Sequence, residues 1–435
     1  MTAYEDFFKN KKITMLGLGL LGRGVGDAEF LAKMGANVLV TDMKTEKELE
    51  TSVEKLKQYP TISFFLGGHR AADFTACDMV IKAAGVPIVS SEIKEAHAAN
   101  VPVYMSTALF AKFARESGAK IVGVTGTRGK STVTNMIFHV LQKAGIPSHL
   151  GGNIRGISTL AMLPEVKKGD ICVLELDSWQ LQGFGDLEMS PDVAVFTNFM
   201  PDHLNYYPNM NAYFSDKANI FKYQKENDTL VVGESVIDRV REAIPQATPT
   251  LPPPIPVDLQ LLVPGEHNRT NAALATAALK ALNIPEDTIR SGLETFPGVE
   301  GRLQFLRRLN GVSIYNDNNA TTPEATIAAL NSFPERTIIL IAGGSDKGLD
   351  LDELVSEIQR TCKKVVLLAG TGTALLQPRI IGNIHNSLEQ AMKDALESAK
   401  TGDVILFSPA FASFGMFKNE YDRNDMFVNI VQKLQ

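Results

Sequence analysis

The feature that most constrains the fold is a regular alternation of short apolar runs with helical segments. An apolar run enters a glycine turn at 12–19, a helix follows and ends at Gly35, and a second apolar run spans Asn37–Asp42. Further apolar runs follow at 79–85 and 101–105. Strands that alternate with helices in this way predict a parallel, doubly wound sheet of the α/β class.

The same alternation starts twice more along the chain. The second series has apolar runs at 120–126, 170–177 and 192–198, and the third has them at 337–344, 364–370 and 403–410. A proline-rich stretch at 248–258 predicts a rigid surface loop before an alanine-rich helix at 268–282. A chain of 435 residues has room for about three domains. We therefore expect three α/β domains, at 1–108, 109–298 and 299–435.

Composition excludes several classes of protein. The 43 basic and 49 acidic residues give a net charge of −6, whereas general nucleic-acid binders carry a basic excess. Cys77, Cys172 and Cys362 lie far apart without a CxxC pair, which favours reduced thiols over a disulfide framework or a zinc site. The first residues show no secretory signal, and no apolar run is long enough to span a membrane. We expect a cytoplasmic protein without a nucleic-acid partner.

The first glycine loop, GLGLLG, suits a nucleotide diphosphate. Gly17, Gly19 and Gly22 follow a predicted strand and precede a predicted helix, and Asp42 lies 20 residues after Gly22. This spacing matches the dinucleotide fingerprint, in which a helix N-terminus faces a pyrophosphate. NAD and a UDP-sugar fit the same geometry, and a tight turn without any ligand would also need these glycines.

The second glycine loop, GVTGTRGKST at Gly123–Thr132, resembles a phosphate loop with an unusual spelling. The common spelling requires glycine five residues before Gly129, but Val124 stands there. A helix starting at Lys130 would still direct backbone N–H groups at an anion. Lys130 would neutralise phosphate, and the Ser131 hydroxyl would bind Mg²⁺.

Two residues downstream support a metal–phosphate site. Glu175 ends one apolar strand, and His203 follows another. Because the ends of parallel strands share one edge of a sheet, we expect Lys130, Glu175 and His203 to lie on adjacent strands. Each residue alone is more often a surface or structural group. Lys217, on a helix among apolar neighbours, is by the same reasoning a snorkelling surface lysine.

At this point the chain resembles the Mur ligases, over essentially its whole length. The motifs that carry the resemblance, in the family's order, are GVTGTRGKST, ELDSWQL, TNFMPDHLNYY, AYFSDKANIF, PGEHNRTNAALA, GRLQFL, YNDNNATTPEAT, GGSDKG and SPAFASFGMFKN. The resemblance is strongest to the members that add D-glutamate to UDP-N-acetylmuramoyl-L-alanine. It implies a Rossmann-like UDP-sugar domain, a central P-loop-type ATPase domain and a C-terminal Rossmann-like domain that binds the amino acid.

The family's chemistry implies ATP, two Mg²⁺ ions and a monomeric enzyme of peptidoglycan synthesis. ATP phosphorylates a carboxylate to an acyl phosphate, the amino group of the incoming amino acid displaces phosphate, and ADP is released. The catalytic set implied by the motifs is Lys130, Glu175, His203 and Lys217. The metal ligands implied are Ser131, Glu175, His203 and Lys217, with Lys217 carbamylated by CO₂.

The motifs also imply the binding residues. Those for ATP are Gly126, Thr127, Gly129, Lys130, Ser131, Thr132, Asn268, Arg302 and Asp317. Those for the UDP-sugar substrate are Gly17, Gly19, Gly22, Asp42, Gly85 and Asn153. Those for the amino acid are Thr321, Lys347 and Ser413.

The sequence departs from the family at both substrate ends. Asn319 replaces a lysine, Gly415 replaces an aspartate and Glu420 replaces an aromatic residue, while Leu20 and Leu21 stand where Thr or Ser often helps to hold diphosphate. Alternatives therefore remain: a Mur-type ligase for another amino acid such as L-glutamate, or for another carboxylate acceptor. Outside the ligases, the candidates are an NAD-dependent oxidoreductase and a non-catalytic nucleotide-binding protein.

Overall fold

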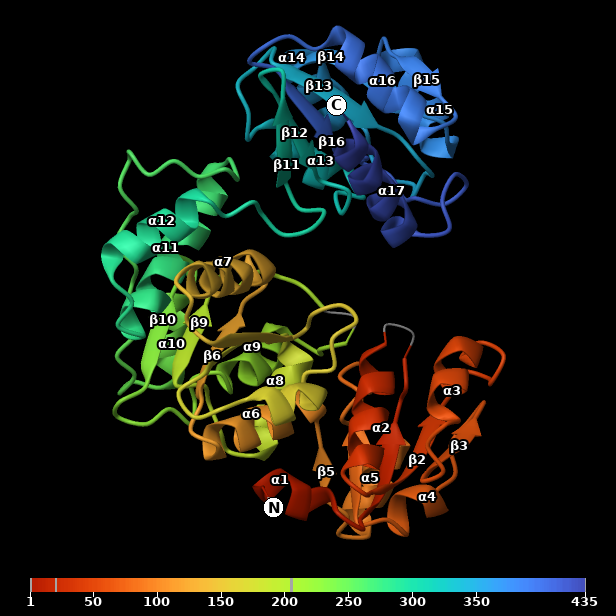
Figure 1. The fold of residues 1–435 in the computed structure, drawn as a ribbon, viewed down its shortest axis with the longest axis vertical. Helices are drawn as coiled ribbons and strands as arrows, with labels where there is room; N and C mark the ends of the chain where they lie inside the picture. Colours follow the sequence, from red (N-terminus) through yellow and green to blue (C-terminus); the bar gives the residue numbers. More distant parts are fainter. Residues whose placement is uncertain (1, 20–21, 204–205, 435) are drawn as a thin grey trace. The chain divides into compact units, whose positions relative to one another are not determined.

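The computed structural model describes residues 2–19, 22–203 and 206–434; Leu20 and Leu21 lie outside the described residues. Within those ranges the strands form three sheets, and helices flank each of them (Figure 1). This confirms the predicted α/β class with three sheet-containing regions.

The first sheet is parallel throughout, with strand order β3-β2-β1-β4-β5. Its strands are β1 (Lys12–Leu16), β2 (Asn37–Asp42), β3 (Ile62–Leu66), β4 (Met79–Lys82) and β5 (Val103–Tyr104). Its helices are α1 (Ala3–Phe8), α2 (Arg23–Lys33), α3 (Glu50–Leu56), α4 (Ala72–Thr75) and α5 (Ser91–Ala98). Along β4 Ile81 packs into the core that contains α2, and Val80 packs into the core that contains α4 and α5. Both faces of the sheet are thus covered, as the apolar strands predict.

The second sheet is also parallel, with strand order β10-β9-β6-β8-β7. Its strands are β6 (Lys120–Thr125), β7 (Ser148–Gly152), β8 (Ile171–Glu175), β9 (Val193–Phe196) and β10 (Thr229–Val232). The helices along this stretch and after it are α6 (Ser106–Glu116), α7 (Lys130–Lys143), η1 (Leu160–Glu165), α8 (Ser178–Asp186), α9 (Met210–Ala218), η2 (Glu234–Val236), α10 (Ile237–Ala243), α11 (Glu266–Ala281) and α12 (Glu286–Glu294).

The third sheet has strand order β11-β12-β16-β13-β14-β15 and is parallel except for the β11–β12 hairpin. Its strands are β11 (Gln304–Leu309), β12 (Val312–Asn316), β13 (Ile338–Ala342), β14 (Cys362–Leu368), β15 (Asn383–His385) and β16 (Val404–Phe407). Its helices are α13 (Pro323–Leu330), α14 (Asp352–Thr361), α15 (Thr371–Leu376), η3 (Gln377–Arg379), α16 (Leu388–Ser398) and α17 (Glu420–Lys433). Leu340 packs with α13 and α14, while Ile339 and Ile341 pack with α16 and α17.

The chain folds into two compact units. One comprises Met1–Pro253 with Ala273–Ile289 and holds the first two sheets, and the other comprises Pro254–Ala272 with Arg290–Gln435 and holds the third. The boundaries near 108 and 298 stay predictions. All three cysteines are free thiols, two of them buried. Among the described residues, we find no helix with the length and apolar character needed to cross a membrane.

Candidate active site

The second glycine loop joins the central strand of its sheet to a helix, as predicted. β6 ends at Thr125, α7 begins at Lys130, and Gly129 caps the helix in the left-handed region at φ 81°. No side chain caps this helix N-terminus. The first N–H groups of α7 therefore remain available to an anion, which is the property that phosphate loops use.

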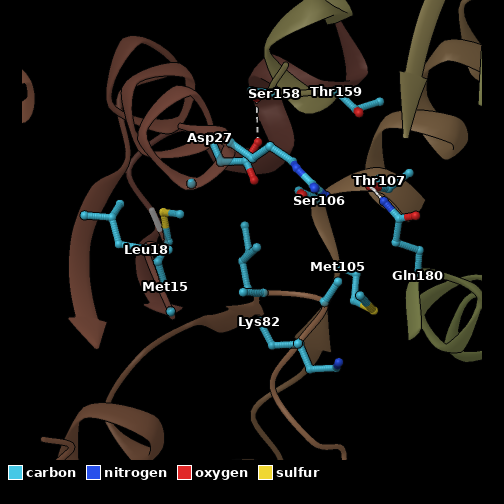
Figure 2. A pocket seen from close by; sticks show the side chains of 18 of the residues that line it. Met15, Leu18, Asp27, Lys82, Met105, Ser106, Thr107, Ser158, Thr159 and Gln180 are labelled. Atoms are coloured by element: carbon cyan, nitrogen blue, oxygen red, sulfur yellow. Dashed lines mark hydrogen bonds between the residues drawn. The ribbon is translucent and has the colours of Figure 1, made fainter. Parts of the chain in front are cut away.

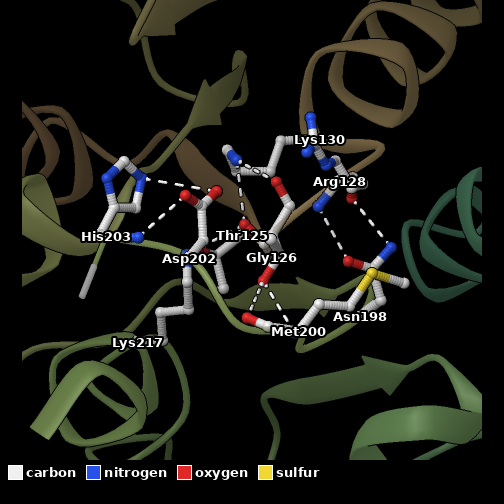
Figure 3. A network of polar contacts seen from close by, with 10 residues as sticks. Thr125, Gly126, Arg128, Lys130, Asn198, Met200, Asp202, His203 and Lys217 are labelled. Carbon is white, nitrogen blue, oxygen red and sulfur yellow. Dashed lines mark hydrogen bonds and ion pairs between the residues drawn. The ribbon is translucent and has the colours of Figure 1, made fainter. Parts of the chain in front are cut away.

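The segment that follows β9 fixes the shape of this loop (Figure 3). Thr197 Oγ1 donates to the Arg128 carbonyl at 2.6 Å, and Asn198 Oδ1 accepts from the Arg128 N–H at 2.8 Å. The Thr127 N–H donates to the Asn198 carbonyl at 2.9 Å. Gly126 lies so close that a Cβ added to it would stand 1.9 Å from Thr197 Oγ1. Only glycine fits at this position.

Two lysines converge on the loop. The Lys130 ammonium donates to the carbonyls of Gly126 and Thr127 at 2.9 and 3.0 Å, and Lys217 Nζ donates to the same Gly126 carbonyl at 2.9 Å. Lys217 is only 1% exposed, so the prediction of a snorkelling surface lysine is wrong. Burial, and then the positive charge of Lys130, lower the pKa of Lys217 to about 7. A lysine with this pKa is partly a neutral amine, and hence a nucleophile, at neutral pH.

Glu175 and His203 lie where the sequence places them. β9, β6 and β8 are neighbours in the sheet, which confirms that Lys130, Glu175 and His203 follow adjacent strands. Glu175 is buried opposite Val124, the penultimate residue of β6. The His203 ring packs 5.0 Å from the ring of Trp179. Their catalytic roles stay predictions.

The predicted metal ligands form an unusual set. Among the described residues, no three His, Cys, Asp or Glu side chains are grouped so as to hold a metal ion. The predicted ligands include only two such residues, Glu175 and His203, and Ser131 and Lys217 complete the set. Carboxylate and hydroxyl oxygens suit Mg²⁺, whereas an ammonium group cannot bind it. The set fits Mg²⁺ only when Lys217 carries a carboxylate of its own.

A pocket of about 220 Å³ is lined by residues of the first sheet and its glycine loop, and by residues between 105 and 180 that belong to the region of the second sheet. Gly17, Gly19 and Gly85 line it, as the sequence predicts for the sugar nucleotide. Figure 2 shows Asp27 and Ser158 on one side of this pocket and Lys82 on the other. The remaining predicted residues for this substrate, Gly22, Asp42 and Asn153, do not line the pocket.

Asp42 contacts the glycine loop itself. Its Oδ2 accepts from the N–H groups of Leu18 and Gly19 at 2.8 and 3.2 Å, and its Oδ1 accepts from the Lys44 N–H at 2.9 Å. Burial acts to raise the pKa of Asp42, but these backbone hydrogen bonds outweigh it and hold the pKa below its usual value. In the dinucleotide fingerprint the glycine loop binds a pyrophosphate and the acidic residue binds a ribose. Here the acidic residue, Asp42, is hydrogen-bonded to the glycine loop.

Asn153 lies beside the end of β8, which carries Glu175. Its N–H donates to the Glu175 carbonyl at 2.8 Å, because β7 pairs with β8 up to this point. This contact relates one predicted substrate residue to one predicted metal ligand.

The three predicted ATP-binding residues of the other compact unit differ in exposure. Asn268 is buried at the start of α11 and donates to the Pro264 carbonyl at 2.7 Å. Arg302 is exposed, and Asp317 is buried. Burial raises the pKa of Asp317 to about 7, opposed by hydrogen bonds from Ser408 Oγ and the Leu303 N–H and by the charge of Arg302.

The predicted amino-acid residues are partly brought together. Lys347 Nζ donates to Thr321 Oγ1 at 3.0 Å. Ser413 is buried in the segment that follows β16. Asn319 donates to the Glu300 carbonyl at 3.2 Å and lies against Gly301. Gly415 adopts φ 99°, a conformation that aspartate rarely adopts, so the loop here differs from the family's pattern.

Sequence reasoning missed three residues that the structure makes prominent. Asp202 accepts from the His203 N–H at 2.8 Å. Arg423 is fully buried and donates to the Asn318 side chain and to the Asn318 carbonyl, at 2.8 and 3.0 Å. Lys82 is buried at the end of β4. The available signal for Lys82 was a charged residue that ends an apolar strand, as Glu175 does; for Arg423 the sequence held none.

Comparison with known proteins gives one family. The Mur ligase MurD-like N-terminal domain matches residues 11–105, the Mur ligase middle domain matches 124–250, and the Mur ligase glutamate ligase domain matches 301–411. The solved structure of UDP-N-acetylmuramate–alanine ligase MurC from Thermotoga maritima covers 97% of this chain and is itself covered to 99%, with a TM-score of 0.59 and 21% identity. That likeness shows the shared fold.

Two curated relatives are closer in sequence. UDP-N-acetylmuramoylalanine–D-glutamate ligase from Roseiflexus sp. (strain RS-1) is 36% identical, over 97% of this chain and 98% of its own length. The protein of the same name from Acetivibrio thermocellus is 34% identical, over 100% of this chain and 99% of its own length. With its phosphate loop, its buried strand-end residues and these full-length matches, the chain belongs to the Mur ligase family.

Proposed function

We propose that this protein is an ATP-dependent, ADP-forming ligase that joins D-glutamate to UDP-N-acetylmuramoyl-L-alanine in peptidoglycan synthesis. The observation that carries the proposal is the loop at 126–129. It combines an uncapped helix N-terminus with two lysine ammonium groups on one carbonyl, at the end of the strand next to Glu175. Relatives that match over nearly the whole of both chains and are named for this reaction support the choice of substrates.

The loop supplies what phosphoryl transfer needs. Catalysis of this step is mostly positioning and charge neutralisation, because charge spreads over the phosphoryl oxygens. Backbone N–H groups of α7 would hold the phosphates, and Lys130 would turn from its loop carbonyls to the transferred group. The carboxylate of the L-alanine moiety becomes an acyl phosphate, and the amino group of the incoming amino acid then displaces phosphate to form the amide.

We further propose that Mg²⁺ binds beside the loop, held by Ser131, Glu175, His203 and a carbamylated Lys217. Bound Mg²⁺ would offset the negative charge of the two reacting polyanions. Lys217 meets the requirements for carbamylation because it is buried, has a pKa of about 7, and has the charge of Lys130 beside it. Addition of CO₂ to its neutral amine would release one proton and leave a carbamate anion beside the Lys130 cation.

The experiment that tests the proposal measures ADP release with UDP-N-acetylmuramoyl-L-alanine and a panel of D- and L-amino acids. We expect a clear preference for D-glutamate. Absence of turnover with any amino acid would overturn the assignment of the acceptor. If ADP were released without an amino acid as fast as with one, the protein would be an ATPase and not a ligase.

A second candidate differs only in the amino acid. Asn319 stands where the family has a lysine, and its amide is bound to the Glu300 carbonyl, so one positive charge is absent near the predicted carboxylate contacts. Preference for another amino acid, L-glutamate included, in the same panel would select this candidate. An NAD-dependent oxidoreductase would leave Lys130, Glu175 and His203 without a role. The fluorescence of NADH should change on mixing with an oxidoreductase and stay unchanged on mixing with a ligase.

A further inference from the structure

A buried lysine outside the predicted catalytic set faces the junction of the first sheet and the central region. Lys82 is the last residue of β4, is 2% exposed, and its side chain lines the pocket at the first glycine loop. Its ammonium group donates to the Val86 carbonyl at 3.1 Å and to Gln182 Oε1 on α8 at 3.4 Å. Both acceptors are neutral.

From Gln182 the hydrogen bonds continue to the helix that carries Lys217. Gln182 Nε2 donates to Asp216 Oδ2 at 2.8 Å, and the Tyr207 hydroxyl donates to the same oxygen at 2.9 Å. Asp216 precedes Lys217 on α9, and Lys217 in turn donates to the Gly126 carbonyl of the phosphate loop. Polar contacts thus run from the pocket as far as Asp216, and the backbone of α9 joins Asp216 to Lys217 at the loop.

Packing alone does not account for an amino group at position 82. Removing an ammonium group from water is costly unless opposite charge offsets it. Burial lowers the pKa of Lys82 to about 8, and the carboxylates of Asp186, Asp177 and Asp216 act in the opposite direction. A methionine would fill the same space among the apolar neighbours of β4 without that cost. The charge therefore has a use that the first sheet itself does not explain.

We propose that Lys82 is a positioning residue of the ligase reaction, which acts through Gln182 on Asp216 and so fixes the α9 segment that carries Lys217. The inference rests on the proposed function. In this role Lys82 would connect the pocket proposed for the sugar nucleotide with the loop proposed for ATP. Lys82 touches neither the phosphates nor the reacting carboxylate in this scheme.

The test is a double-mutant cycle with Lys82→Met and Gln182→Leu, measured as kcat and as KM for ATP. Residues that act as one unit are not additive. We expect each single variant to lower kcat about 10-fold, with KM for ATP nearly unchanged. The double variant should be no worse than the worse single one, whereas independent effects would multiply to about 100-fold. Lys82→Arg, which keeps a donor, should recover most of kcat.

A matched control separates positioning from loss of stability. Lys364→Met removes a partly buried lysine that is paired with Asp394 in the other compact unit. It should lower the melting temperature without changing kcat. The chain's only tryptophan, Trp179, is on α8 with Gln182 and contacts His203 and Tyr206. The change in Trp179 fluorescence on titration with an ATP analogue should differ from that of the wild type in Lys82→Met and should match it in Lys364→Met.

The outcomes distinguish the two proposals. Turnover by the wild type together with multiplicative losses in the cycle overturns the role of Lys82 alone. A Lys82→Met variant that matches Lys364→Met in kcat and in Trp179 fluorescence does the same. Absence of turnover by the wild type overturns the proposed function and this inference with it. If Lys82→Met does not fold, Gln182→Leu against Lys364→Met decides the matter, because it leaves the charge of Lys82 in place.

Discussion

Replacing Gly126 by alanine tests the phosphate loop at its tightest point. The added Cβ would lie 1.9 Å from Thr197 Oγ1 and 3.1 Å from both the backbone N and O of Asn198. Real Cβ atoms stay beyond about 3.0 Å, so Thr197 and the loop must separate by roughly 1.1 Å. Thr197 can rotate only by giving up its hydrogen bond to the Arg128 carbonyl.

The cost can be worked out from these contacts. The lost hydrogen bond contributes about 1 kcal/mol, and alanine at the φ of +145° found for Gly126 costs about 1–3 kcal/mol. If the loop relaxes instead, the same 2–4 kcal/mol or so appears as lost nucleotide affinity. At 1.4 kcal/mol for each tenfold change, ATP binding should weaken by about 30- to 700-fold.

The assay is calorimetric titration with a non-hydrolysable ATP analogue, alongside thermal unfolding. Gly145→Ala is the control: Gly145 also has a positive φ, at +67°, but nothing lies within 4 Å of its added Cβ. It should lower stability and leave affinity unchanged. Thr197→Ala in the Gly126→Ala background removes the clashing oxygen and should restore at least about 10-fold of the affinity. Equal affinity of Gly126→Ala and Gly145→Ala for the ATP analogue would refute the role given to the close contact between Gly126 and Thr197.

Three further predictions concern charged groups. Lys130→Met should lower kcat by about 10³-fold or more, since charge neutralisation carries phosphoryl transfer, while Lys143→Met at the far end of α7 should not; ADP release measures both. Added bicarbonate should raise wild-type activity and give a carbamate carbonyl signal in ¹³C NMR, and a signal that persists in Lys217→Met would place the modification elsewhere. Because the pKa of Asp317 is raised from 3.8 to about 7, the folded state holds a proton that the unfolded state has released, so this contribution to stability is present below about pH 4 and is lost as the pH rises to 7. Asp317→Asn should therefore flatten the fall in the free energy of urea unfolding between pH 5 and pH 8, and an unchanged slope would contradict the assignment.

Much of the fold follows from apolar patterning. The second strand was expected at Asn37–Asp42 and β2 has these bounds, and α7 begins at Lys130 as the glycine loop predicts. The β11–β12 hairpin was not expected. Its first strand is partly exposed along its length and carries Arg307 and Arg308, so its sequence lacks the apolar run that marks the parallel strands. The antiparallel edge is set by tertiary packing.

The sequence predicts the site residues that follow strand ends. It does not predict contacts between residues that only the folded chain brings together. The chain order alone cannot show that Lys217 shares a carbonyl with Lys130, because the two lysines lie far apart in the sequence. Helical spacing suggested an exposed amino group, yet the side chain is buried under Tyr213 and the loop. Likewise the spacing of Asp42 matches the dinucleotide fingerprint and places it among the predicted substrate residues, but it does not show that its carboxylate accepts from the N–H groups of the glycine loop.

Two of the departures from the family, Asn319 and Glu420, lie on segments that the buried side chain of Arg423 connects. Arg423 donates to the Asn318 side chain and carbonyl and to the Phe411 carbonyl, and Asn318 donates to the carbonyl of Glu420. Asn319 thus follows a residue that Arg423 contacts, and Glu420 is bound by the same residue through its carbonyl. A change of charge at either position acts on a fixed frame rather than on a mobile loop. We propose that the choice of amino acid depends on the side chains that this segment presents together with the Lys347–Thr321 pair, whose contact with the amino acid stays a prediction.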